Sequence, residues 1–292
     1  MPREVSHIKT PMGDIAYEER GSGPPALFVH GVFLNGYLWR NVVDRVADVR
    51  RCIAIDLLAH GATKTPEDSD LSFPAQAEML EAFCEALSLE QVDLVGNDSG
   101  GGIAQIFAAH YPHRLRSLTL TNCDVHDNWP PEAFQPTMRA VAEGGLKDMG
   151  EAMLADIETA RAALSVGYEH PEHLSEETVR TYIKPLQDDV AIRNLERWFE
   201  AMDSAQTVAV EGQLRQLVVP TLIVWGTGDI FFDVKWAYWL RDTIPGSREV
   251  IELEGAKLFF PEERADELAA ALRDHWEFAE ATEVTDGALA ER

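Results

Sequence analysis

The chain has 292 residues, 46% of them hydrophobic, and its formal net charge is −25 at pH 7. This length suits one large domain with an insertion, or two ordinary domains, and the hydrophobic content is enough for a substantial core. Because so acidic a chain repels phosphate backbones and anionic lipids, the composition argues against nucleic acid and membrane surfaces as partners.

The N-terminus and the cysteines favour a cytoplasmic protein. Residues 1–14 contain no apolar signal core, and no stretch approaches the roughly 18 uninterrupted apolar residues of a membrane span. The three cysteines, Cys52, Cys84 and Cys123, are far apart and odd in number. They therefore predict neither a disulfide framework nor a metal-ligand cluster.

In the first part of the chain, short apolar runs typical of buried strands alternate with helical patterns. The runs predict strands over 13–19, 26–30, 51–57, 91–96 and 115–121. The patterns between them predict helices over 37–49, 73–87 and 100–110. Alternation of this kind indicates the α/β class, with a mostly parallel sheet and helices on both faces.

The alternation is interrupted once, by a helical and charged segment over 127–213 that has no clear strand runs. It returns after Pro220, where the patterns predict strands over 221–225 and 248–253 and helices over 234–243 and 261–277. The simplest organisation has three parts, which are an α/β core (1–126 and 214–279), a helical cap (127–213) and a disordered acidic tail (280–292).

The turn at residues 94–104, LVGNDSGGGIA, joins a predicted strand to a predicted helix. A residue exposed at so sharp a turn has a strained backbone, and the residues two before and two after it must be small. Gly96 and Gly100 meet this condition around Asp98, and Ser99 then begins the helix. Asp98 is therefore the predicted nucleophile or base. The alternative is a carboxylate that only caps the helix.

Several motifs occur in the order that is typical of the α/β-hydrolase superfamily. They resemble the family's oxyanion loop, its Asp-x-x-Gly-x-Gly-x-Ser loop in a degraded form, its nucleophile elbow, its triad-acid turn and its histidine stretch. In that order they read FVHGVFLNGYLW (28–39), IDLLAHGAT (55–63), VGNDSGGGIAQ (95–105), IVWGTGD (223–229) and GAKLFFPEERADELAAAL (255–272). The resemblance covers most of the chain outside the helical segment, which corresponds to the family's cap.

The family usually has serine at the elbow tip, and aspartate there resembles the haloalkane dehalogenases and epoxide hydrolases. In such enzymes a carboxylate attacks an alkyl halide or epoxide, and water activated by a histidine then hydrolyses the alkyl ester. The resemblance implies that Asp229 is the triad acid. It implies that the oxyanion site consists of His30, Gly31, Val32, Phe33 and Ser99. The expected donors are the main-chain N–H groups of Ser99 and of Val32 or Phe33, and His30 is expected to orient the loop.

The stretch that should carry the catalytic histidine lacks it. In GAKLFF the position falls on Leu258, and the sequence has no histidine between Asp229 and His275. An alkyl ester on Asp98 would then have no imidazole to activate water, a form of help that is worth about 10² to 10⁴-fold.

Three residues are candidate replacements for the histidine. Asp124 and His126 follow the strand that comes after the elbow helix, and their alternative roles are to cap the first cap helix or to face water. Lys257 precedes the Leu258 position, and a buried lysine can act as a base, although a surface lysine is the simpler interpretation. Asp124 and His126 therefore join Asp98 and Asp229 as candidate catalytic residues.

The accessory groups of the two aspartate branches differ here. The resemblance to haloalkane dehalogenases implies two halide donors, an aromatic residue after the nucleophile and a second residue after the His-Gly pair. In this sequence these two positions hold Ser99 and Val32. Epoxide hydrolases use cap tyrosines to protonate the epoxide oxygen. Tyr168 and Tyr182 are candidates for this role, and packing is their alternative.

Three functions fit these observations. The first is a hydrolase of an epoxide, alkyl halide or related electrophile, with Asp98 as nucleophile or base. The second is a lyase, isomerase or cyclase in which Asp98 shuttles a proton. The third is a ligand-binding homologue without turnover. Each has a small-molecule partner and implies no cofactor and no metal, and the sequence leaves a homo-oligomer open.

Overall fold

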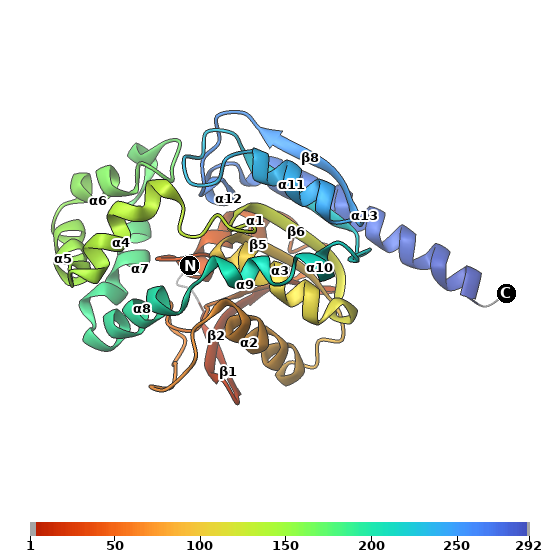
Figure 1. Ribbon diagram of the computed structural model, residues 1–292, viewed down its shortest axis with the longest axis horizontal. Coiled ribbons are helices and arrows are strands. Elements are labelled where there is room, and N and C mark those ends of the chain that lie inside the picture. The colour runs from red at the N-terminus through yellow and green to blue at the C-terminus, as the bar shows by residue number, and fades with distance from the viewer. Residues whose placement is uncertain (1–3, 291–292) are drawn as a thin grey trace.

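The computed structural model describes residues 4–290, and one eight-stranded sheet runs through its described part (Figure 1). The spatial order is β1-β2-β4-β3-β5-β6-β7-β8. In chain order the strands are β1 (Ser6–Thr10), β2 (Gly13–Arg20), β3 (Pro25–Val29), β4 (Arg51–Ile55), β5 (Val92–Asp98), β6 (Leu115–Cys123), β7 (Thr221–Gly226) and β8 (Ser247–Leu253). Strands β1 and β2 are antiparallel to their neighbours, and the other six run parallel.

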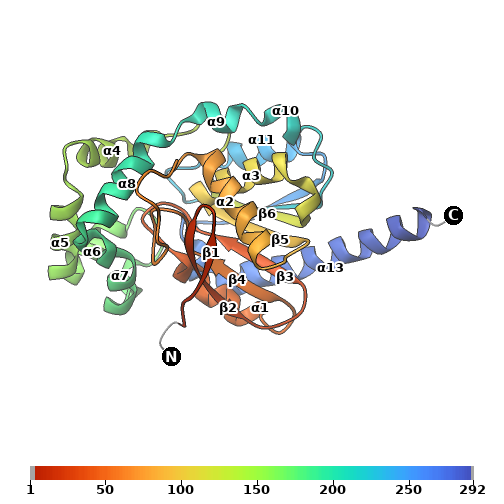
Figure 2. The same cartoon turned by 90° about the horizontal axis from the view of Figure 1, so that it is seen from below.

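Helices cover both faces of the sheet, and the predicted fold class is thereby confirmed. Figure 2 shows α2 and α3 on one face and α1 and α13 on the other. The core helices are α1 (Arg40–Val46), α2 (Phe73–Ala86), α3 (Ser99–His110), α11 (Lys235–Thr243), α12 (Phe260–Glu263) and α13 (Ala265–Ala290). The side chain of Ser72 accepts a hydrogen bond from the Ala75 N–H, which fixes the start of α2 as a helix cap should.

The helical segment between β6 and β7 divides into two groups. Five helices gather at one end of the molecule and form the cap (Figure 1). They are α4 (Gln135–Ala142), α5 (Leu146–Ala155), α6 (Ile157–Leu164), α7 (Glu176–Ile183) and α8 (Asp189–Ala201). The short helices α9 (Ser204–Val208) and α10 (Glu211–Leu214) instead pack on α3. The last part of the segment predicted as cap therefore covers the core.

The C-terminal helix differs from the prediction of a disordered tail over 280–292, of which residues 291–292 lie outside the described part. Helix α13 continues to Ala290 and projects from the body (Figure 2). This segment is rich in alanine and glutamate, which are good helix formers, and it extends a helix that is already nucleated, so it avoids the unfavourable nucleation step. None of the helices in the described part is both long and apolar enough to span a membrane.

Candidate active site

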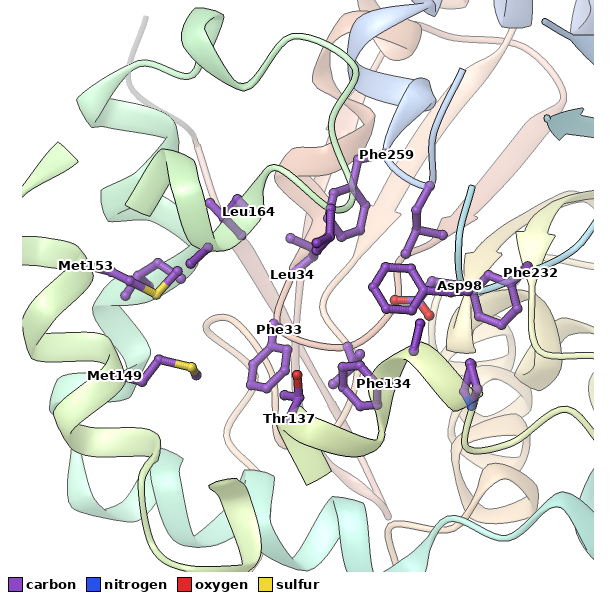
Figure 3. A pocket seen from close by; sticks show the side chains of 18 of the residues that line it. Phe33, Leu34, Asp98, Phe134, Thr137, Met149, Met153, Leu164, Phe232 and Phe259 are labelled. Carbon is purple, nitrogen blue, oxygen red and sulfur yellow. The ribbon is translucent and has the colours of Figure 1, made fainter. Parts of the chain in front are cut away.

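Asp98 stands at a sharp turn between β5 and α3, beside the cap (Figure 3). Its φ is 57°, in the left-handed region, which strains any residue other than glycine. A Cβ on Gly96 would lie 2.7 Å from the carbonyl oxygen of Gly100, and a Cβ on Gly100 would lie 2.3 Å from that of His30. The turn is tolerated because both neighbours are glycine, and it presents the carboxylate at the carboxyl edge of the parallel strands.

Two main-chain N–H groups face the Asp98 carboxylate. One belongs to Ser99, the first residue of α3, and the other to Val32, in the loop after β3. Both favour the charged form of the carboxylate and so lower its pKa. Of the two expected loop donors, Val32 therefore faces Asp98, and Phe33 contributes its side chain to the cavity wall.

His30 and Gly31 shape the loop that carries Val32. The Leu57 N–H donates to His30 Nε2 at 3.1 Å, so Nδ1 carries the proton and donates to the Gly31 carbonyl oxygen at 2.7 Å. Gly31 must be glycine because a Cβ there would lie 2.2 Å from Asp98 Oδ2. Both nitrogens of this buried imidazole are thus engaged within the loop.

Two further carboxyl groups lie near Asp98. The Asp124 N–H faces the Asp98 carbonyl oxygen at 3.4 Å, and neither oxygen of the buried Asp124 side chain has a hydrogen-bond partner. Asp229 follows β7 and accepts hydrogen bonds from Asn122 Nδ2 at 2.8 Å and from the Phe231 N–H at 2.7 Å. Three of the four predicted catalytic residues therefore gather at one edge of the sheet.

Burial of these carboxyl groups changes their protonation. Burial, followed by the charge of Asp229, raises the pKa of Asp98 to about 7. Burial raises the pKa of Asp229 to about 6. Burial and the charge of Asp98 raise the pKa of Asp124 well above its ordinary value. Near neutral pH the site therefore retains protons that exposed aspartates would release.

Leu258 occupies the position expected for the histidine. Its carbonyl oxygen accepts a hydrogen bond from Asn97 Nδ2 at 3.1 Å, and its side chain lines the cavity beside Asp98. Lys257 Nζ donates to the carbonyl oxygen of Ser165 in the cap at 2.8 Å and does not line the cavity. The candidate base Lys257 is thus engaged elsewhere.

His126, the fourth predicted catalytic residue, lies away from the cavity. Its φ of 52° turns the chain after Asp124, and its Nε2 lies 3.2 Å from a carboxylate oxygen of Glu211 on α10. Its ring packs against Trp239, with the ring centroids 4.9 Å apart. The imidazole therefore serves a contact between the loop, α10 and α11 rather than Asp98.

An apolar cavity of about 250 Å³ connects Asp98 with the cap (Figure 3). Among the described residues that line it, Asp98 is the only charged one, and Thr137 provides the one aliphatic hydroxyl. In the view of Figure 3, Met149, Met153 and Leu164 lie at the opposite end from Asp98, with Phe33 and Leu34 between. The arrangement suits an apolar molecule whose reactive atom contacts Asp98.

The comparison with protein families agrees with this geometry. Residues 24–263 match the family model described as the alpha/beta hydrolase fold. The chain belongs to this family.

The chain is also similar, over most of its length, to individual proteins of known name. The chain is 27% identical over 283 residues to haloalkane dehalogenase 2 of Mycobacterium tuberculosis, covering 93% of this chain and 94% of the relative. It is 24% identical over 277 residues to a cis-3-alkyl-4-alkyloxetan-2-one decarboxylase of Shewanella oneidensis, covering 88% and 83%. A solved haloalkane dehalogenase from Bradyrhizobium elkani has a TM-score of 0.78 at 23% identity, covering 96% of this chain and 99% of its own.

The cap tyrosines of this α/β hydrolase do not reach the cavity. The hydroxyls of Tyr168 and Tyr182 donate to Glu262 Oε2 at 3.1 and 2.8 Å, and Arg40 pairs with the other oxygen of the same carboxylate. The two tyrosines therefore fasten the cap to the core. The packing alternative describes them better than the protonation of an epoxide.

Several residues of the site were missed in the sequence. Phe231 and Phe232 line the cavity and lie two and three residues after Asp229, so their proximity to the acid was an available signal. Asn122 donates hydrogen bonds to both Asp229 and the Gly226 carbonyl oxygen and had a similar signal, since it lies one residue before the end of β6. The cap residues of the cavity carry no such signal, because helix packing alone brings them to Asp98.

Proposed function

We propose that this chain is a hydrolase that acts on a small apolar electrophile, an epoxide, an alkyl halide or a related molecule, with Asp98 as the nucleophile. The observation that carries the proposal is the single charged side chain of an otherwise apolar cavity, at a strained turn and facing two N–H donors. The dehalogenase relative supports the substrate class.

The first step follows from the position of the carboxylate. An ionised Asp98 oxygen attacks the electrophilic carbon, a C–O bond forms, and the bond to the leaving group breaks. The N–H groups of Val32 and Ser99 stabilise negative charge on the carboxyl group, both before attack and when water later adds to the ester. Because the pKa of Asp98 is about 7, the reactive anion prevails only above neutral pH.

The second step is the slow one in this proposal. The position of the histidine holds Leu258, and His30 has both ring nitrogens engaged. Loss of general-base help slows hydrolysis by about 10² to 10⁴-fold. We therefore expect the alkyl ester on Asp98 to accumulate with simple alkyl halides and epoxides.

Intact-protein mass spectrometry tests the proposal. Wild type, Asp98→Asn and Asp68→Asn are incubated with a short alkyl iodide and a short terminal epoxide, where Asp68 is an exposed control carboxylate. We expect an added mass in wild type and Asp68→Asn that is absent in Asp98→Asn. If the three proteins gain the same mass, or none gains any, Asp98 is not a nucleophile, and a ligand-binding protein becomes the better description.

A further inference from the structure

The cavity offers little help to a departing group. Trp129 lines the cavity, but its Nε1–H donates to the Met202 carbonyl oxygen at 3.2 Å. In the view of Figure 3, the hydroxyl-bearing Thr137 lies beside Phe33 and apart from the Asp98 carboxylate. Among the described residues that line the cavity, none is a histidine, lysine or arginine. A substrate for this site must therefore bring its own stable leaving group.

The fate of the ester sets a second condition on the substrate. With Leu258 in the histidine position, water addition to an Asp98 ester lacks an imidazole. An intermediate that expels the carboxylate again, by an elimination within the substrate, needs neither water nor a base. The substrate should then carry, on the carbon next to the attacked one, a group that departs and leaves its bonding electron pair behind to form a double bond.

A four-membered lactone meets both conditions. We propose that this site decarboxylates oxetan-2-ones that carry small alkyl groups on ring carbons 3 and 4, and converts them to an alkene and CO₂. This inference rests on the proposed role of Asp98 as nucleophile, but it replaces hydrolysis by elimination. The Shewanella oneidensis relative is named a cis-3-alkyl-4-alkyloxetan-2-one decarboxylase, and 24% identity does not by itself assign that activity to this chain.

The proposed reaction balances without any proton or water. An Asp98 oxygen attacks ring carbon 4, the C4–O bond breaks, and the ring oxygen becomes part of a carboxylate on carbon 3. The bond between carbon 3 and this carboxylate then breaks and CO₂ departs. The electron pair left on carbon 3 forms the double bond to carbon 4, and the Asp98 carboxylate leaves with its own pair. One negative charge is present throughout.

The structure fits both steps. The ring strain and the carboxylate leaving group replace the halide donors and proton donors that the cavity lacks. The new carboxylate forms among apolar side chains with no cation, a setting that destabilises it and so favours loss of CO₂. The N–H groups of Val32 and Ser99 stabilise the Asp98 carboxylate as it departs. The cavity volume, about that of eight waters, suits short alkyl groups.

Product analysis tests the inference. Wild type, Asp98→Asn, Asp98→Ala and the control Asp68→Asn are incubated with cis-3,4-dimethyloxetan-2-one. But-2-ene is measured in the headspace by gas chromatography, and the 3-hydroxy acid that hydrolysis would form is measured in solution. Thermal melts confirm that each variant is folded. We expect but-2-ene from wild type and Asp68→Asn and its loss in both Asp98 variants.

The other outcomes separate this inference from the proposed function. A stable lactone adduct on Asp98, or an Asp98-dependent 3-hydroxy acid without alkene, would overturn the decarboxylation and retain Asp98 as nucleophile. But-2-ene at the same rate from both Asp98 variants would show that Asp98 is not involved. No reaction with the lactone, the alkyl iodide or the epoxide would overturn both proposals together.

Discussion

Replacing Asp229 by asparagine removes a negative charge that disfavours ionisation of Asp98. The pKa of Asp98 rises from 3.8 to about 7, with burial as the first cause and the charge of Asp229 as the second. Since burial remains in the variant, we expect the pKa of Asp98 to fall by about one unit, which corresponds to about 1.4 kcal/mol. At pH 6.5 the ionised fraction of Asp98 would then be about threefold larger than in wild type.

The assay follows the alkylation of Asp98 across pH. Initial rates of adduct formation with a short alkyl iodide are measured by intact mass from pH 5 to 9 in wild type, Asp229→Asn and the exposed control Asp68→Asn. The reactive form is the anion, so each rate should rise with pH through the pKa of Asp98. A midpoint that stays at the wild-type value, or that rises, in a folded Asp229→Asn protein would refute the electrostatic coupling.

Three further predictions concern the same region. Leu258→His should restore hydrolysis and shorten the life of an Asp98 ester by about 10² to 10⁴-fold, as read from the decay of the adduct mass. Gly100→Ala should lower the free energy of unfolding by about 3 kcal/mol in denaturant titrations, because its Cβ would meet the His30 carbonyl oxygen; unchanged stability would contradict the elbow geometry. Asp98→Asn should be more stable than wild type at pH 8, by about 4 kcal/mol at most, and equal to it near pH 4. In wild type, the raised pKa of Asp98 makes the native state bind more protons than the unfolded state between pH 4 and pH 8, so stability falls as pH rises. Parallel pH–stability curves of the two proteins would contradict this prediction.

Much of the core was predictable because its parallel strands are buried on both faces. A strand such as β5 consists of a continuous buried run that ends in the glycine-rich turn, so its identity and the exposure of Asp98 follow from local sequence. The edge strand β1 is largely exposed and has no such run, and it was not among the predicted strands. The extension of α13 to Ala290 was not predicted from the sequence. A polar composition shows that a segment is exposed, but an exposed segment can still be helical.

The residues of the site that directly follow strands could be predicted from the sequence. The residues that helix packing brings to the site could not. The turns after β5, β6 and β7 bring Asp98, Asp124 and Asp229 together at one sheet edge, as the strand order requires. Local sequence does not determine the path of a loop. His126 points away from Asp98, toward Glu211, although it is only two residues from Asp124. The apolar walls from the cap depend on how its helices pack, which no local pattern encodes.

The carboxylate of Glu262 limits how a substrate can enter. It pairs with Arg40 of the core and accepts hydrogen bonds from two cap tyrosines, so lifting the cap would break two buried hydrogen bonds to a carboxylate. Rigid cap opening is therefore disfavoured. Exchange is left to small side-chain movements where the cavity meets the surface, at the exposed residues Ala133 and Val166. Such an aperture selects slender molecules by their cross-section before any chemistry begins, and it slows the departure of bulky products more than that of a gas and a short alkene.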